Sequence, residues 1–128
     1  RVTTEEHYEL TPIIVKRLRT NIKNILWGNC TPIPNDLPQG NKNSEKAPNT
    51  KEQELTNKQA IIRNLSILRV MNELNIPVVN LYKLTIKNIN NIQLPKDVHF
   101  SLEGNKIIAF EIVKQICKNF NYNINYEI

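Results

Sequence analysis

Residues 24–30, with the sequence Asn-Ile-Leu-Trp-Gly-Asn-Cys, decide the fold class of this chain. An apolar run followed by a Thr-Pro-Ile-Pro turn at residues 31–34 is typical of a short buried strand that ends in a turn. A second run, residues 77–81, is apolar on both sides of Asn80 and predicts another strand. A helix predicted between the two strands makes them a βαβ unit, in which the strands are parallel and the crossover is right-handed.

Amphipathic helices are predicted around these strands. Residues 3–6 fit a capping box that opens a helix running to about Arg19, in which Pro12 requires either a kink or a later start. A second capping box, residues 56–59, opens the crossover helix; a weaker helix follows over residues 82–92, and a last one from about residue 102 to 119. Apolar spacing predicts these buried residues: Tyr8, Ile14, Val15 and Leu18 in the first helix, Ile61, Ile62, Leu65, Leu68, Met71 and Leu74 in the crossover helix, and Ile108, Ile112, Val113, Ile116 and Phe120 in the last helix.

Two parallel strands are too few for an independent sheet, because such strands need helices on both faces and usually further neighbours. We therefore expect residues 1–128 to form a single, partial α/β domain, with the rest of the sheet supplied from elsewhere. Residues 31–54 are rich in proline and in Asn, Lys and Gln, which predicts a long irregular loop. The tail after residue 121 is expected to be frayed or a marginal extension.

Composition narrows the classes of partner and cofactor. The net charge of +5 comes mostly from scattered lysines, and the densest basic group, residues 16–19, has no interleaved aromatic residue, so a solvated helix face is favoured over a nucleic-acid site. No apolar run reaches the roughly 20 residues of a membrane span, and the N-terminal stretch lacks the layout of a signal peptide. Arg1 suggests a chain that is processed, trimmed or partial. Its compartment is not indicated.

The two cysteines, Cys30 and Cys117, have neither metal-ligand nor Cys-x-x-Cys spacing and are expected to be buried free thiols. The sequence contains no metal constellation, paired carboxylates or phosphate-cradling loop, so no cofactor is predicted. His7 is expected to be a solvated helix residue. A nucleophilic Cys30 served by a histidine is disfavoured, because a cysteine that closes a buried strand is usually packed and inert.

The chemistry of the chain is concentrated in residues 97–104, Asp-Val-His-Phe-Ser-Leu-Glu-Gly. They place Asp97 and His99 on a short loop directly before the last predicted helix. Histidine can take up and return a proton near neutral pH, and a loop histidine supported by a rigid helix is a common way to present a general base. Without further support, a loop histidine with no catalytic role would be the commoner interpretation.

Several segments in order resemble the C-terminal half of the SGNH (GDSL-type) esterases and lipases. The most specific are the Asp-Val-His-Phe-x-x-Glu-Gly block ending at Gly104 and the Leu-Trp and Thr-Pro-Ile-Pro segments of residues 26–34. Residues 79–82 resemble a strand end of that family, and Asn64 with Met71 matches one of its helices. The resemblance implies a flavodoxin-like α/β/α sandwich and ester hydrolysis by a serine nucleophile. It makes His99 the general base, oriented either by Asp97 or by a backbone carbonyl.

The chain also departs from that family. Lys96 occupies the usual position of the acidic partner, and Asn80 stands where the family has Asp. A Gly-Asp-Ser nucleophile turn, an oxyanion glycine and a Gly-x-Asn-Asp segment have no counterpart. The serines are Ser44 in the polar loop, Ser66 within a helix, and Ser101, which is best explained as an N-cap.

Two hypotheses follow. The chain is the base-bearing C-terminal half of an ester hydrolase, whose missing N-terminal half, in the same or a separate chain, supplies the serine. Alternatively, it is a non-catalytic remnant or binding module that retains the half-fold. The expected partner is a small-molecule, carbohydrate or lipid ester, and neither nucleic acid nor a membrane span is expected. The particular ester is not indicated, since half of the pocket walls would come from the missing half.

Overall fold

The computed structural model describes residues 3–34, 57–95 and 97–123. Within these ranges the order of elements is α1 (Thr4–Arg19), β1 (Trp27–Gly28), α2 (Asn57–Glu73), β2 (Val78–Val79), α3 (Leu81–Ile86), α4 (Ile89–Ile92) and α5 (Leu102–Phe120). The chain is therefore a mixed structure of helices and strands, and it is mostly helical. The predicted irregular loop falls largely outside the described residues, as do Thr56 of the second capping box and the last five residues of the tail.

The two strands pair in parallel, as predicted. Trp27 lies opposite Val78 and Gly28 opposite Val79. The ladder is extended at both ends, because the Trp27 N–H donates to the Pro77 carbonyl (2.9 Å) and the Asn29 N–H donates to the Val79 carbonyl (3.2 Å). Both strands are shorter than predicted, since each finds a partner only over this short register.

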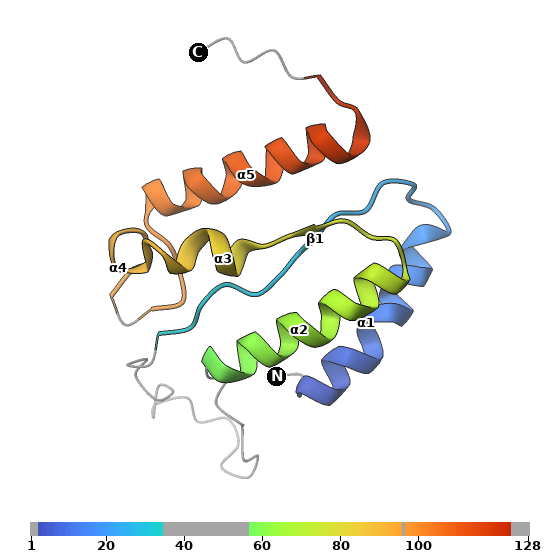
Figure 1. Cartoon of the computed structure of the whole chain (residues 1–128), viewed down its shortest axis with the longest axis horizontal. Helices are drawn as coiled ribbons and strands as arrows, with labels where there is room; N and C mark the ends of the chain where they lie inside the picture. The colour runs from blue at the N-terminus through green and yellow to red at the C-terminus, as the bar shows by residue number, and fades with distance from the viewer. Residues whose placement is uncertain (1–2, 35–56, 96, 124–128) are drawn as a thin grey trace, which may run out of the picture.

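Helices cover both sides of the strand pair (Figure 1). The helices α1 and α2 pack against each other on one side, and α5 runs along the other. The core lies between the strands and the α1/α2 layer; its buried residues are Val15, Ile67, Val70, Met71 and Ile76, with Ile25, Trp27, Leu74 and Val78 packed against them. Layers on both faces are what a parallel strand pair requires.

The first helix begins where the sequence predicts. The Glu6 N–H donates to Thr3 Oγ1 (3.1 Å) and the Thr3 N–H donates to Glu6 Oε2 (2.7 Å), which completes the capping box. The helix continues through Pro12, so a later start is wrong. The basic group near its C-terminus is exposed and lies in the last turn, where positive charge is favourable to the helix dipole.

The predicted buried faces of α1 and α2 are largely wrong. Only Val15 and Met71 are buried, and Leu74 is half-buried; the other predicted core residues are exposed, namely Tyr8, Ile14, Leu18, Ile61, Ile62, Leu65 and Leu68. The buried stripe of α2 is Ala60, Ile67, Val70 and Met71. Apolar residues nearly encircle α2, so their spacing alone cannot select the inward face. The half-buried Asn64 lies on the side of α2 that faces the segment after β1, where it bonds to Cys30.

The weaker predicted helix is split at Asn88 into α3 and α4. The last helix is confirmed: Ser101 is its N-cap, with Oγ accepting from the Gly104 N–H (3.1 Å), and Asn121 ends it in the left-handed region with φ of 56°. Its five predicted core residues are half-buried rather than buried. None of the helices in the described ranges is both long and apolar enough to cross a membrane.

Candidate functional site

The carboxyl ends of β1 and β2 are joined by an amide pair. Asn29 Nδ2 donates to Asn80 Oδ1 (3.1 Å), and Asn29 Oδ1 accepts from the Tyr82 N–H (3.0 Å). Asn80 Oδ1 also accepts from the Lys83 N–H (2.9 Å), which makes Asn80 the N-cap of α3. Asn80 therefore has a structural role, as the cap of α3 and a partner of Asn29, at the position where the family that the sequence resembles has Asp.

The segment that follows β1 is fixed by two asparagines of α2. Asn64 Oδ1 accepts from the Cys30 N–H (2.8 Å) while its Nδ2 donates to the Cys30 carbonyl (2.9 Å), so both backbone groups of Cys30 are satisfied by one side chain. Asn57 Oδ1 accepts from the Ile33 N–H (3.2 Å), and its Nδ2 donates to the Tyr82 hydroxyl (3.0 Å). The Thr-Pro-Ile-Pro segment is thus held against α2 and α3.

The structure brings Asp97 and His99 together on the loop between α4 and α5. His99 Nδ1 lies 2.6 Å from Asp97 Oδ1, and the same oxygen accepts from the His99 backbone N–H (3.1 Å). The loop is closed at its base by two backbone bonds, from the Leu94 N–H to the His99 carbonyl (3.0 Å) and from the Ser101 N–H to the Ile92 carbonyl (2.8 Å). The pair is accessible, since 77% of the His99 side chain and 41% of the Asp97 side chain is exposed.

The electrostatics of the pair favour an ionised Asp97. The backbone N–H of His99 and then its imidazole hold the pKa of the Asp97 carboxyl below its ordinary value. The ionised carboxylate favours the tautomer in which Nδ1–H donates to it, which leaves the Nε2 lone pair to accept a proton. Among the described residues Nε2 has no hydrogen-bond partner. An incoming hydroxyl can therefore reach it.

A glycine positions the helix behind this loop. A Cβ on Gly104 would lie 2.5 Å from the Ile92 carbonyl oxygen and 3.1 Å from Phe100 Cβ. Only glycine therefore allows the first turn of α5 to approach α4 this closely. The close approach sets the direction in which the loop leaves α4 and returns to α5.

The serines do not complete a triad within the described residues. Ser101 is occupied as the N-cap of α5, as the sequence predicts, and Ser66 lies on α2. Ser44 and Lys96 lie outside the described residues. No serine hydroxyl in residues 3–34, 57–95 and 97–123 is hydrogen-bonded to His99.

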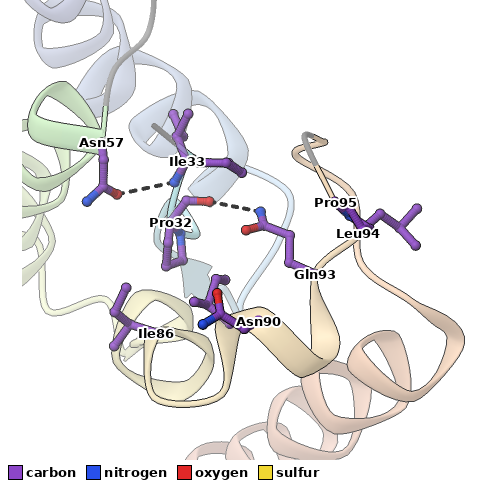
Figure 2. Close-up of a pocket in the computed structure, with 10 residues that line it drawn as sticks. Pro32, Ile33, Asn57, Ile86, Asn90, Gln93, Leu94 and Pro95 are labelled. Carbon is purple, nitrogen blue, oxygen red and sulfur yellow. Dashed lines mark hydrogen bonds between the residues drawn. The ribbon is translucent and has the colours of Figure 1, made fainter. Parts of the chain in front are cut away.

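A cavity of about 510 Å³ lies at the same end of the strands, beside the loop (Figure 2). Among the described residues its lining is uncharged and consists of Pro32, Ile33, Pro34, Asn57, Ile86, Ile89, Asn90, Gln93, Leu94 and Pro95. Prolines and branched side chains supply apolar walls, and three amide side chains supply hydrogen-bonding groups. Sequence reasoning did not identify Asn57, Asn90 or Gln93, because isolated amide residues carry no recognisable motif.

The other histidine differs from its prediction. His7 is half-buried rather than solvated, and its ring packs edge-on against Trp27 with centroids 6.3 Å apart. Its buried Nδ1 has no partner among the described residues. Burial, and secondarily the positive charge of Arg63, lowers the pKa of His7. The neutral imidazole is therefore the form that this packing favours.

The cysteines are free and half-buried. Burial raises the pKa of the Cys30 thiol, so the reactive thiolate is disfavoured, in agreement with the expectation that Cys30 is not a nucleophile. No group of three His, Cys, Asp or Glu residues that could hold a metal ion occurs in the described part of the chain.

Comparison with known proteins adds no relative. No protein-family model matches the sequence, and no curated protein is significantly similar to it.

Proposed function

We propose that this chain is the base-bearing part of a serine ester hydrolase of the SGNH type. The observation that carries the proposal is the 2.6 Å contact between His99 Nδ1 and Asp97 Oδ1 on an exposed loop. In the reaction, His99 Nε2 takes the proton of a serine hydroxyl as the serine attacks the ester carbonyl. It then returns this proton to the leaving alcohol.

In this proposal Asp97 orients the imidazole and stabilises the cation that forms when His99 takes the proton. Asp97, two positions before His99, thus serves as the acidic partner of the histidine. Lys96, which occupies the family's usual position for this partner, carries no carboxylate. The serine and the oxyanion donors come from a segment other than these 128 residues, of the same protein or of a partner chain. The substrate is an uncharged carbohydrate or lipid ester, since the described residues that line the neighbouring cavity are all uncharged.

The proposal includes the fold of the complete domain. A flavodoxin-like α/β/α sandwich, of which this chain is the C-terminal part, is supported by the parallel strands with helices on both sides. In such folds ligands bind outside the carboxyl ends of the strands. Asn29, Asn80 and the cavity lie at that end.

A second candidate function is a binding module without catalysis. It is favoured by one observation: at Asn80, where the family that the sequence resembles has Asp, the side-chain oxygen caps α3 and accepts from Asn29. An ester or sugar would then bind in the uncharged cavity without turnover. Saturable binding of a sugar acetate with no release of acetate, in the complete protein, would favour this candidate.

The proposed hydrolase is tested by replacing its base. In the protein expressed from its complete coding sequence, His99→Ala should lower kcat/KM for p-nitrophenyl acetate by about 10²- to 10⁴-fold, because general-base assistance is lost. His7→Gln is the matched control: it removes the other histidine, which lies against Trp27, and should retain activity at neutral pH. Equal activity of His99→Ala and the parent protein would eliminate His99 as the base.

A further inference from the structure

We infer that Gln93 is a positioning residue, whose amide holds the peptide unit that carries His99. This inference rests on the proposed function for its consequence in catalysis, but its structural part can be measured separately. Gln93 directly follows α4 and precedes the Asp97–His99 loop.

The burial of Gln93 is unusual in this chain. Three polar side chains are buried among the described residues: Thr11, Thr85 and Gln93. The hydroxyls of Thr11 and Thr85 donate to carbonyls one turn earlier in their own helices. Gln93, which is 8% exposed, instead reaches a segment 61 residues away in sequence. A buried amide that makes such a contact specifies a tertiary arrangement, because leaving it unpaired would be costly.

The two amide hydrogens of Gln93 have two different acceptors. Nε2 lies 3.1 Å from the Pro32 carbonyl oxygen and 3.4 Å from that of Val98. The bond to Pro32, drawn in Figure 2, ties the amide to the segment after β1. The bond to Val98 ties it to the Asp97–His99 loop. One side chain therefore joins the end of the strand layer to the loop.

The hydrogen bond from Gln93 to the Val98 carbonyl restrains the peptide group between Val98 and His99. The Val98 carbonyl and the His99 N–H belong to the same planar peptide group. Gln93 holds the oxygen of this group, and Asp97 Oδ1 accepts from its N–H at 3.1 Å. With both ends held, the group cannot rotate without breaking one of the two bonds, so the backbone that carries His99 is restrained. The contact of Nδ1 with Asp97 Oδ1 (2.6 Å) then holds the ring itself.

The backbone of Gln93 is also anchored. Its N–H donates to the Ile89 carbonyl (2.9 Å), and it forms an antiparallel bridge with Phe100. Gln93 also lines the uncharged cavity, so the positioning amide lies between the cavity and the base. A loss of the amide should therefore loosen the loop while the core around Met71 is retained.

The structural test compares Gln93→Met with Gln115→Met. Methionine keeps the length of glutamine but cannot donate, and Gln115 on α5 donates to Glu111 (2.7 Å) away from the loop. Amide hydrogen exchange of Leu94 and His99 should become on the order of 10-fold faster in Gln93→Met, with α2 amides unchanged. Gln115→Met should leave both loop amides as in the parent protein. Unchanged loop exchange in folded Gln93→Met would overturn the inference.

If Gln93→Met fails to fold, hydrogen exchange of side-chain amides in the unsubstituted protein tests the inference instead. The side-chain NH₂ protons of Gln93 should exchange with solvent far more slowly than those of the exposed Asn90. Equal exchange rates would overturn the inference.

The catalytic readout separates this inference from the proposed function. Gln93→Met in the complete protein should lower kcat by about 10- to 100-fold, a larger effect than any change in KM caused by its place in the cavity wall, because misplacing a base affects the chemical step. Suppose that loop exchange is faster in Gln93→Met but that His99→Ala remains fully active. The positioning role of Gln93 would then stand, and only the proposed hydrolase function would be rejected. A rise in KM alone would overturn the positioning of the base.

Discussion

At the scale of single residues, the carboxylate of Asp97 is the group that, in the proposed hydrolase, distinguishes His99 from an ordinary surface histidine. Asp97→Asn keeps an oxygen for the His99 N–H but removes the charge that orients and stabilises the imidazolium. We expect kcat to fall on the order of 100-fold with KM little changed. The control is Glu103→Gln, which neutralises an exposed carboxylate that pairs with Lys106 at 4.0 Å. Equal losses in both variants would contradict a specific role for Asp97.

His7 predicts a pH dependence of folding stability. Its pKa in the folded chain is lowered from 6.5 by burial and by Arg63, so the unfolded chain binds its proton more readily. The stabilisation is complete above pH 6.5 and is lost as the pH falls through the lower folded value. The midpoint of urea unfolding should be lower at pH 5 than at pH 7.5, and His7→Gln should reduce this difference. The same difference in both proteins would show that His7 does not contribute.

The residues of the site were only partly predictable. Asp97 and His99 are close in sequence and stand before a predicted helix, so a local pattern places them together. The Gln93 amide is anchored by the Pro32 carbonyl, 61 residues away in sequence, and no local pattern specifies that contact. The half-buried environment of His7 likewise depends on how α1 packs against Trp27, which its position on a helix does not reveal.

At the scale of elements, the α4–α5 junction depends on Gly104. Gly104→Ala should destabilise the chain by about 1–3 kcal/mol, because the added Cβ would lie 2.5 Å from backbone oxygen at Ile92. This loss should exceed the gain of about 1 kcal/mol that alanine brings to a helix. Urea unfolding measures the difference.

Gly28→Ala is the control for this junction. Its Cβ would meet Leu81 Cδ1 at 3.2 Å, the end of a side chain that can shift, so a smaller effect is expected. If Gly104→Ala were as stable as the parent protein, the tight approach of α4 and α5 would be contradicted.

The existence of the elements was predictable, but the inward face of α2 was not. Its capping signals and apolar content indicate a helix. Ile61, Ile62, Leu65 and Leu68 then compete with Ile67, Val70 and Met71 for the core, and tertiary contacts decide between them. One such contact is the paired hydrogen bonding of the half-buried Asn64 with Cys30, which joins the inward side of α2 to the segment after β1.

At the scale of the whole molecule, large apolar side chains are exposed on both helix layers. Examples are Ile13 (61%) and Leu65 (65%) on the α1/α2 side, and Leu102 (75%) and Phe110 (59%) on α5. Within the described residues β1 pairs only with β2, so its other edge is free for pairing. The 128 residues alone should therefore bind a hydrophobic dye or self-associate. A monomer in analytical ultracentrifugation that melts sharply and binds no dye would contradict this expectation.

The order and the parallel pairing of the two strands were predictable from local sequence patterns. The order of strand, helix and strand indicates a parallel pair, because a long helical crossover is required between parallel neighbours. The extent of the strands was not predictable, since a strand lasts only as long as its partner, and pairing depends on residues far apart in sequence.

The central claim, that His99 activates a serine, is tested most directly by the rate of covalent labelling with a fluorophosphonate, followed by intact mass. In the complete protein we expect one label, on a serine, and a rate at least about 100-fold lower for His99→Ala than for the parent protein. Equal labelling rates in the two proteins, or no labelled serine in the parent protein, would contradict the account.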